Sequence, residues 1–242
     1  MGVSFAIPIE LALDVANQLK TTGRVSRGWL GVLIQDVTRD LAESFGMNKP
    51  IGALVAEVMA GSPAELGGVQ VGDVIVRFGG ADIPTSAALP PIVGRTSIGE
   101  DVSATVVRDG KELELTIPVG ELPQQATQRL PENRRRAPAP QPDAKSERLG
   151  LEVEPLSEER KETLGVDLGV QVLEVLPGAA AESGIMAGDV IRMLNHIQID
   201  SVESFRTVVD NLPSGRSVPI LIHRNGNARF LRSKCRNKQR GT

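Results

Sequence analysis

GVQVGDVI at residues 68–75 decides the fold of this chain, because it recurs almost letter for letter as GIMAGDVI at residues 184–191. The two stretches lie 116 positions apart (188 − 72), and the same offset carries Ala64 onto Ala180 and Leu89 onto Phe205. A shared offset over about 45 residues indicates an internal repeat. One unit of about 90 residues, used twice, therefore predicts two small domains with a spacer between them.

Around each GDVI stretch, aliphatic runs bounded by glycine predict a unit of short strands. Asp109-Gly110, like Asn225-Gly226 in the second unit, is a hairpin signal, since both central positions of such a turn need positive φ. The expected strands lie at 27–34, 52–58, 73–78, 101–108 and 111–119, then at 148–153, 169–175, 189–194 and 228–231. The last strand is expected to be curtailed, because the chain turns wholly polar after Leu231.

Each unit is also expected to carry two helices, a very short one at 62–68 or 179–183 and a longer one at 86–93 or 202–211. Ser62 is a favourable N-cap residue, and Pro63 suits the first helical position. Pro90 and Pro91 conflict with the longer helix of the first unit, because they remove two backbone donors from its interior. That helix is expected either to begin late or to be distorted.

The remaining segments predict five parts: 1–23, 24–122, 123–147, 148–232 and 233–242. Residues 1–23 read as a strand at 3–7 and a helix that begins at Pro8 and ends at Gly23. They are either the end of a preceding domain or a brace against the first unit. Residues 123–147 have almost no apolar content and predict a disordered linker, and 233–242 predict a disordered tail.

Composition excludes several classes of function. The net charge of −3 predicts no bulk attraction to nucleic acid or to a membrane surface. No stretch approaches 18 uninterrupted apolar residues, so no membrane insertion is expected. The apolar start lacks a basic n-region and is broken by Glu10 and Asp14, which argues against a signal peptide and for a cytoplasmic product if Met1 is the true start.

The chemistry-bearing side chains show no catalytic or metal-binding pattern. Both histidines, His196 and His223, fall in the second unit with no serine or cysteine in a nucleophile-elbow context beside them, and they are expected to be structural. Two histidines and the distant Cys235 have no metal-ligand spacing. Asp73 and Asp189 are expected to cap neighbouring amides. We therefore expect no catalytic residue, metal or cofactor.

A family resemblance follows from three features that each unit repeats: an aliphatic-Gly-aliphatic turn, Ala-x-x-x-Gly and Gly-Asp-Val-Ile. The units resemble PDZ domains of the bacterial, circularly permuted kind. The resemblance implies an α+β, mostly β fold: two PDZ-like domains, each a partly open barrel or sandwich of five or six strands with two helices, joined by a flexible linker.

Phe5-Ala6-Ile7-Pro8, placed before two such domains, is similar to a segment of the HtrA (DegP, DegQ and MucD-like) periplasmic serine proteases. In that family this strand closes the protease domain, so the resemblance is to the C-terminal tandem PDZ region. The sequence from Met1 on holds no protease triad, and activity of this chain alone is not expected. The resemblance implies a periplasmic location, a protease domain as partner in cis or in trans, and a trimer-based oligomer only where that domain is present.

A PDZ-type groove binds an extended peptide by strand addition and holds its terminal carboxylate on consecutive backbone amides. Both grooves are expected to prefer apolar C-termini. The predicted peptide-binding residues of the first unit are Arg27, Trp29, Leu30, Gly31, Val32, Ile34, Leu89, Ile92 and Val93. Those of the second unit are Leu149, Gly150, Leu151, Val153, Phe205, Val208 and Val209.

Three functions remain open at this point. The first is a non-catalytic tandem PDZ module that captures C-termini or extended segments of unfolded proteins, in the manner of the substrate-recognition and oligomer-regulating part of an HtrA protease. The second is a fragment of an enzyme whose activity belongs to a longer product. The third is a stand-alone PDZ adaptor without any protease partner.

Overall fold

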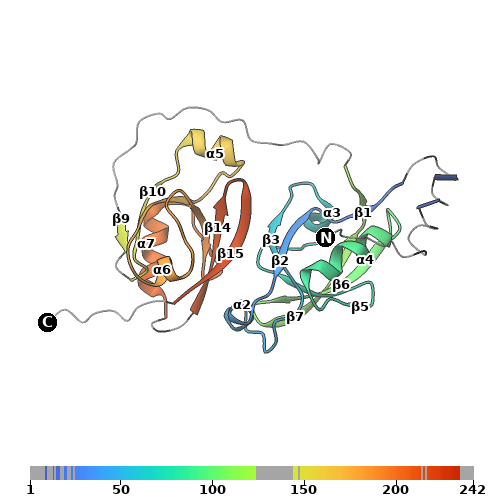
Figure 1. Cartoon of the computed structure of the whole chain (residues 1–242), viewed down its shortest axis with the longest axis horizontal. Coiled ribbons are helices and arrows are strands. Elements are labelled where there is room, and N and C mark those ends of the chain that lie inside the picture. The colour runs from blue at the N-terminus through green and yellow to red at the C-terminus, as the bar shows by residue number, and fades with distance from the viewer. Residues whose placement is uncertain are drawn as a thin grey trace, which may run out of the picture.

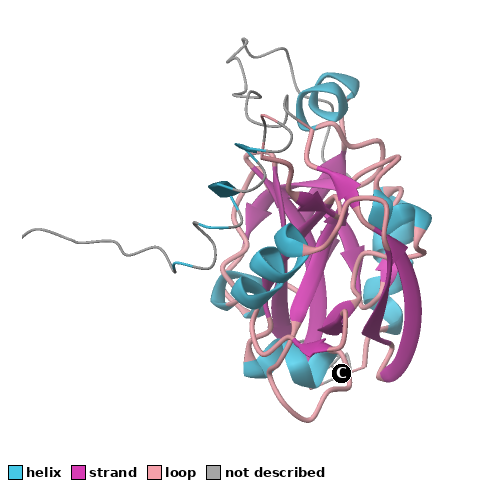
Figure 2. Cartoon of the chain, turned by 90° about the vertical axis from the view of Figure 1, so that its right-hand side faces the viewer, coloured by secondary structure: helices cyan, strands magenta, loops and turns pink. Residues whose placement is uncertain are grey.

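Two antiparallel sheets of like topology, one in each half of the chain, carry the fold (Figure 1). The computed structural model describes residues 25–123, 144–146, 148–213, 215 and 217–234, together with 9, 13, 15–16, 19–20 and 23. The strands lie at the centre of the molecule and the helices on its outside (Figure 2). None of the described helices is long and apolar enough to cross a bilayer.

The first domain is built on a sheet with the strand order β2-β3-β4-β6-β7. Its strands are β2 (Val32–Asp36), β3 (Ala53–Val58), β4 (Val74–Phe78), β6 (Asp101–Arg108) and β7 (Lys111–Pro118), with β5 (Ala81–Asp82) paired to β4. A separate ladder joins β1 (Gly28–Trp29) to β8 (Gly120–Glu121). The helices are α2 (Arg39–Ser44), α3 (Pro63–Leu66) and α4 (Leu89–Arg95), the last preceded by the 3-10 turn η1 (Ser86–Ala88).

The second domain repeats this sheet in the order β15-β14-β12-β11-β10, with β9 as one further strand beside β10. Its strands are β9 (Ala144–Ser146), β10 (Leu151–Pro155), β11 (Val170–Val175), β12 (Val190–Leu194), β13 (Ile197–Gln198), β14 (Ser217–Arg224) and β15 (Asn227–Lys234). Its helices are α5 (Glu158–Leu164), α6 (Ala179–Glu182) and α7 (Val202–Asn211). The β14–β15 hairpin matches β6–β7 of the first domain, and β9 has no counterpart there.

The prolines in the longer helix of the first domain are accommodated as expected, because α4 begins late. It starts at Leu89, so Pro90 and Pro91 fall in the first turn, where missing N–H groups cost nothing. At the start of the chain, the described positions between 9 and 20 are helical, and the N–H of Gly23 donates to the carbonyl of Leu19 at 3.1 Å. The strand expected at 3–7 lies outside the described residues.

Two predictions about segment ends are wrong. The closing strand of the second domain is not curtailed, because β15 pairs with β14 over eight residues, from Asn227 to Lys234. Ser233, placed in the tail by the sequence prediction, is fully buried. The linker prediction is also wrong at its end, because residues 144–146 form β9; residues 124–143 and 235–242 lie outside the described residues.

The GDVI motif is repeated because its aspartate holds a buried ion pair. The Asp73 side chain is 1% exposed and accepts two hydrogen bonds from the Arg108 guanidinium, both 2.7 Å, and one from the amide of Gln70, 2.8 Å. The hydrogen bonds from Arg108 to Asp73 raise the pKa of the guanidinium above its ordinary value. The amide contact confirms that this aspartate caps a neighbouring amide, and the arginine adds a tie to the hairpin that follows.

The second domain repeats the ion pair with nearly the same lengths. Asp189 accepts two hydrogen bonds of 2.6 Å from Arg224 and one of 2.9 Å from the amide of Met186. Arg224 also donates to the carbonyl of Gly184 at 2.7 Å. In each domain the pair therefore joins the loop before β4 or β12 to the far end of β6 or β14.

A third apolar cluster joins the two domains. It combines the outer face of the first sheet with α2 and with the β14–β15 hairpin, which faces the first domain in Figure 1. Its buried members are Val37, Leu41, Ala42, Phe45, Leu54, Ala56, Val74, Val107, Leu221, Ala228 and Phe230. Because strand side chains alternate between faces, β3 is buried on both sides: Ala53 and Val55 in the domain's own core, Leu54 and Ala56 in this interface.

Polar contacts surround this apolar interface. The Gln35 side chain donates to the carbonyl of Phe230 at 3.2 Å and accepts from its amide at 2.7 Å, so it caps the edge of β15. Arg232 pairs with Asp40 at 3.0 Å.

Both histidines of the chain also lie at this interface. His196 lies 3.3 Å from the carbonyl oxygen of Ser44, and its ring meets Phe45 edge-on. His223 is buried, with Nε2 3.7 Å from Glu57, and its interaction with this carboxyl lowers the pKa of Glu57. Both histidines were predicted to be structural, and in the structure each of them contacts the other domain.

Candidate functional site

A groove of about 300 Å³ lies between β2 and α4 in the first domain. It brings together eight of the nine residues predicted there. Ile92 does not line it and packs instead against the domain core. The lining residues are Arg27, Gly28, Trp29, Leu30, Gly31, Val32, Ile34, Leu89, Pro90, Val93, Gly94 and Leu122.

The turn at the head of the groove directs two backbone amides into it. The carbonyl of Leu30 accepts from the amide of Ala64 at 2.9 Å, and that of Gly31 accepts from the amide of Met59 at 2.9 Å. In a trans peptide unit the C=O and the following N–H point in opposite directions. The N–H groups of Gly31 and Val32 therefore point away from the domain body, on the side where both residues line the groove.

Gly31 is required by both conformation and space. Its φ is +79°, a region that other residues rarely adopt. A Cβ atom at this position would lie 2.3 Å from the Cβ of Ser62 and 3.0 Å from the Trp29 ring. The ring thus lies directly beside the turn, and Trp29 forms part of the groove wall.

The open side of the groove is a strand edge. Within the part of the chain that the structure describes, β2 is the end strand of its sheet and pairs with β3 alone. At its far end, the Asp36 carboxylate accepts from the amide of Ser86 at 3.0 Å and from its hydroxyl at 2.7 Å. These bonds lower the pKa of Asp36 and hold β2 to the start of the helix that forms the opposite wall. Sequence reasoning missed this tie, because the two residues lie 50 positions apart.

The second domain builds the same turn. The carbonyls of Leu149 and Gly150 accept from the amides of Ala180, 3.1 Å, and Leu176, 2.9 Å, so the amides of Gly150 and Leu151 point the other way. Gly150 again has a positive φ, +73°. The seven residues predicted for this groove are all buried, and the six other than Gly150 belong to the domain's core cluster.

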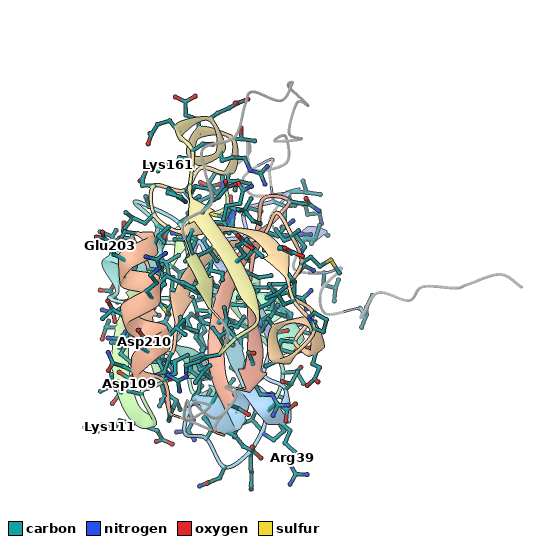
Figure 3. The ribbon with its side chains drawn as sticks, turned by 90° about the vertical axis from the view of Figure 1, so that its left-hand side faces the viewer. Arg39, Asp109, Lys111, Lys161, Glu203 and Asp210 are labelled. Atoms are coloured by element: carbon teal, nitrogen blue, oxygen red, sulfur yellow. The ribbon has the colours of Figure 1, made fainter. Side chains whose placement is uncertain are left out.

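The edge of the second groove, however, is already occupied. β9 pairs antiparallel with β10, with Ser146 opposite Leu151 and Ala144 opposite Val153. It also contacts α7, the helix that carries Glu203 and Asp210 in Figure 3. β9 therefore lies between strand and helix, with its C-terminal end toward the glycine turn, as a bound peptide would.

Arg148 fixes this arrangement just after β9. Its guanidinium donates to the carbonyls of Val209, Asp210 and Leu212, at 2.6, 2.8 and 2.8 Å, at the end of α7. Unpaired carbonyls and the negative end of the helix dipole favour a cation there. In the first domain the equivalent position before the turn is Trp29, which pairs with β8 instead. The two grooves thus differ in what precedes the glycine turn.

Two prolines in β9 are expected to open the second groove. Because alternate residues of a strand donate to its neighbour, one of the two residues Ala144 and Lys145 donates its N–H to β10. In an Ala144→Pro/Lys145→Pro variant that N–H is lost, so β9 cannot pair with β10. We expect the number of bound peptides per chain in isothermal titration calorimetry to rise from one to two. A Lys145→Ala variant, which keeps the backbone donor, should stay at one. One peptide per chain in the proline variant would contradict an edge blocked by β9.

The described residues hold no group of three histidine, cysteine, aspartate or glutamate side chains placed to bind a metal ion. His196 and His223 both serve the domain interface, and Asp73 and Asp189 are committed to arginines. The chemistry that the site offers is therefore backbone hydrogen bonding, an anion cradle and an apolar wall.

Comparisons with known proteins agree with this geometry. The family model described as PDZ domain matches residues 28–119 and 147–234. A probable periplasmic serine endoprotease DegP-like of Hahella chejuensis is 50% identical over 238 residues, which cover 98% of this chain and 50% of that protein. A protein of the same description from Pseudomonas savastanoi is 47% identical, over 97% of this chain and 48% of its own length.

The chain thus spans about half the length of the curated relatives it matches. Among solved structures, the HtrA-type protease AlgW with decapeptide is 38% identical, with a TM-score of 0.44, over 48% of this chain and 36% of that one.

Proposed function

We propose, from the premise that this chain belongs to the PDZ domain family and holds two of its domains, that it binds the free C-termini of extended peptides through its first domain. One observation carries the proposal: the amides of Gly31 and Val32 point into an open groove beside an edge of β2 that pairs with no other described strand. Such amides hold a carboxylate, and such an edge accepts a further strand.

The affinity expected of this groove is modest. Three or four backbone hydrogen bonds contribute about 0.5–1.5 kcal/mol each. One apolar side chain against Leu89 and Val93 contributes about 1.5–3 kcal/mol. Together these contributions reach at most about 9 kcal/mol before the costs of association, so we expect dissociation constants that are micromolar at the tightest. Weak, sequence-tolerant binding suits the capture of unfolded chains better than tight recognition of one partner.

The similarity to periplasmic serine endoproteases supports a wider function for this binding. We infer that the chain acts in the periplasm as the substrate-recognition part of an HtrA-type protease, with a protease domain supplying the catalytic triad and the trimer. Capture falls to the first groove, since β9 covers the edge of the second. The second domain instead contributes a large apolar contact to the first, which supports a role in fixing the geometry of the pair.

Fluorescence polarisation with labelled octapeptides ending in valine tests the peptide proposal. We expect the peptide with a free C-terminal carboxylate to bind with micromolar affinity. Amidating that terminus should weaken the affinity by at least about tenfold, because the backbone N–H groups of the turn then lose their charged partner. Gly31→Ala is expected to lose binding to a similar degree, whereas Gly150→Ala, the matched change in the covered groove, leaves it unchanged. Equal binding of acid and amide would contradict the carboxylate site whether or not the variants fold.

A further inference from the structure

A cleft of about 570 Å³ lies between the two domains, next to the peptide groove. The first domain lines it with the far half of β2 and the start of α2, and the second lines it with α6 and β15. Its lining residues are Leu33, Ile34, Gln35, Asp36, Thr38, Asp40, Leu41, Glu182, Ser183, Asn227, Ala228, Arg229, Phe230, Leu231 and Arg232. Ile34 lines both the groove and the cleft, so the two cavities meet at β2.

The direction of a bound peptide leads toward this cleft. Its terminal carboxylate lies at Gly31, before the first residue of β2, so the upstream residues must run along β2 toward Asp36. An extended chain advances about 3.3 Å per residue. Residues about three to six positions from the C-terminus therefore lie level with Leu33 to Asp36, where the cleft begins.

Strand alternation decides what these upstream residues contact. On β2 itself, Val32 and Ile34 pack against the domain's own core, whereas Leu33 packs into the interface and Gln35 bonds to β15. A strand added beside β2 has the same two faces. Every second side chain of the peptide therefore faces α4, and those between them face the second domain.

The walls of the cleft are mixed, with apolar side chains such as Leu33 and Leu231 beside charged ones. Arg232 is paired with Asp40, and Asp36 is held by Ser86. Among the described residues, Glu182 and Arg229 are exposed and have no ion-pair partner, so both signs of charge are available on the wall that the second domain provides. A charged side chain of the peptide can therefore meet an opposite charge there.

We propose that the second domain reads the upstream residues of a peptide bound in the first, through the cleft between β2 and β15. The proposal rests on the proposed function and adds a specificity to it. The preferred ligand is an extended peptide of at least six residues, apolar at its free C-terminus and with charged residues upstream.

Peptide length separates this inference from the proposed function. By isothermal titration calorimetry, a tripeptide measures the carboxylate groove alone, and an octapeptide with the same C-terminus and a charged upstream half measures groove and cleft. In the native chain we expect the octapeptide to bind at least about tenfold more tightly. In a Phe230→Glu/Leu221→Thr variant, whose interface is opened, the gain should fall below about threefold while tripeptide binding stays unchanged.

Arg229→Glu is a second variant that tests the cleft and leaves the apolar interface between the domains intact. Arg229 is exposed, so the variant is expected to fold. It should weaken an octapeptide with acidic upstream residues by at least about threefold and leave the tripeptide unaffected. If the octapeptide gained as much affinity over the tripeptide in the opened variant as in the native chain, or gained none in either, the inference would be overturned. Tripeptide binding would in that case still support the carboxylate groove of the first domain. Absence of tripeptide binding would instead remove the proposed function, and the inference with it.

Discussion

Asp189→Ala is expected to destabilise the second domain by about 3–5 kcal/mol, measured as the free energy of unfolding in urea. Asp189 is 1% exposed and accepts three hydrogen bonds, two from Arg224 and one from the amide of Met186. Its removal leaves the Arg224 side chain, which is 25% exposed, without its counter-charge, and an amide without its acceptor. Because both costs fall on the folded state alone, the loss is a large fraction of the stability of a small domain.

Asp73→Ala should have the same effect on the first domain, since Arg108 and Gln70 make the equivalent contacts. A matched control is Asp82→Ala, which breaks the exposed pair between Arg77 and Asp82. An exposed pair contributes about 0–1 kcal/mol, so this variant should unfold close to the native midpoint. If Asp82→Ala were as costly as Asp73→Ala, burial would not be the reason for the GDVI motif.

Phe230→Glu combined with Leu221→Thr is expected to separate the two domains without unfolding either. Phe230 and Leu221 are 2% and 3% exposed in the interface, and truncating a buried phenylalanine alone costs about 3–5 kcal/mol. The new residues are those of the first domain at the matching positions, Glu114 and Thr105, where the same hairpin is stable with them. The charge at position 230 then cannot be buried against Phe45.

Small-angle scattering should show an increased radius of gyration for this variant, and calorimetry should resolve two unfolding transitions where the native chain gives one. Leu113→Thr serves as the control, because Leu113 lies on the same kind of hairpin but is 38% exposed. It should leave both measurements unchanged. One transition and an unchanged radius in the double variant would mean that the apolar contact does not hold the domains together.

Much of each domain could be predicted because its signals are local or repeated. The 116-residue offset places Asp73 and Asp189 in the same role, and the structure shows the same contacts in both. From backbone chemistry alone, Pro90 and Pro91 predict a helix that either begins late or is distorted, and the structure shows the late start. The glycine turn likewise follows from its pattern, since only glycine suits the positive φ and close approach at position 31.

The contacts between elements distant in sequence could not be predicted in this way. β9 lies in a segment of linker-like composition, and Arg148, just after it, bonds to the end of α7, which is far away in the sequence. The wholly polar run after Leu231 suggested a tail from Ser233 on. The chain instead continues as a strand to Lys234, because β15 pairs with β14 over its whole length, and Asp40 of the other domain pairs with Arg232.

One signal of the interface was present in the sequence. Where the first unit has Thr105 and Glu114, the second has Leu221 and Phe230, so its hairpin is apolar on the face that should meet solvent. A difference between two copies of one unit indicates what each copy contacts beyond itself. Comparing the copies for their differences would have predicted a docking face, whereas comparing them for likeness predicted the fold.

The short connection between β9 and β10 sets the affinity that a peptide needs in order to enter the second groove. Only residues 147–150 separate the two strands, so β9 is present at an effective concentration on the order of millimolar. A segment that would bind the groove weakly as a free peptide is thus sufficient to fill it. A competing peptide at micromolar concentration succeeds only if its intrinsic affinity exceeds that of β9 by about a thousandfold, the ratio of the two concentrations. The second groove is therefore closed to the weak ligands that the first accepts.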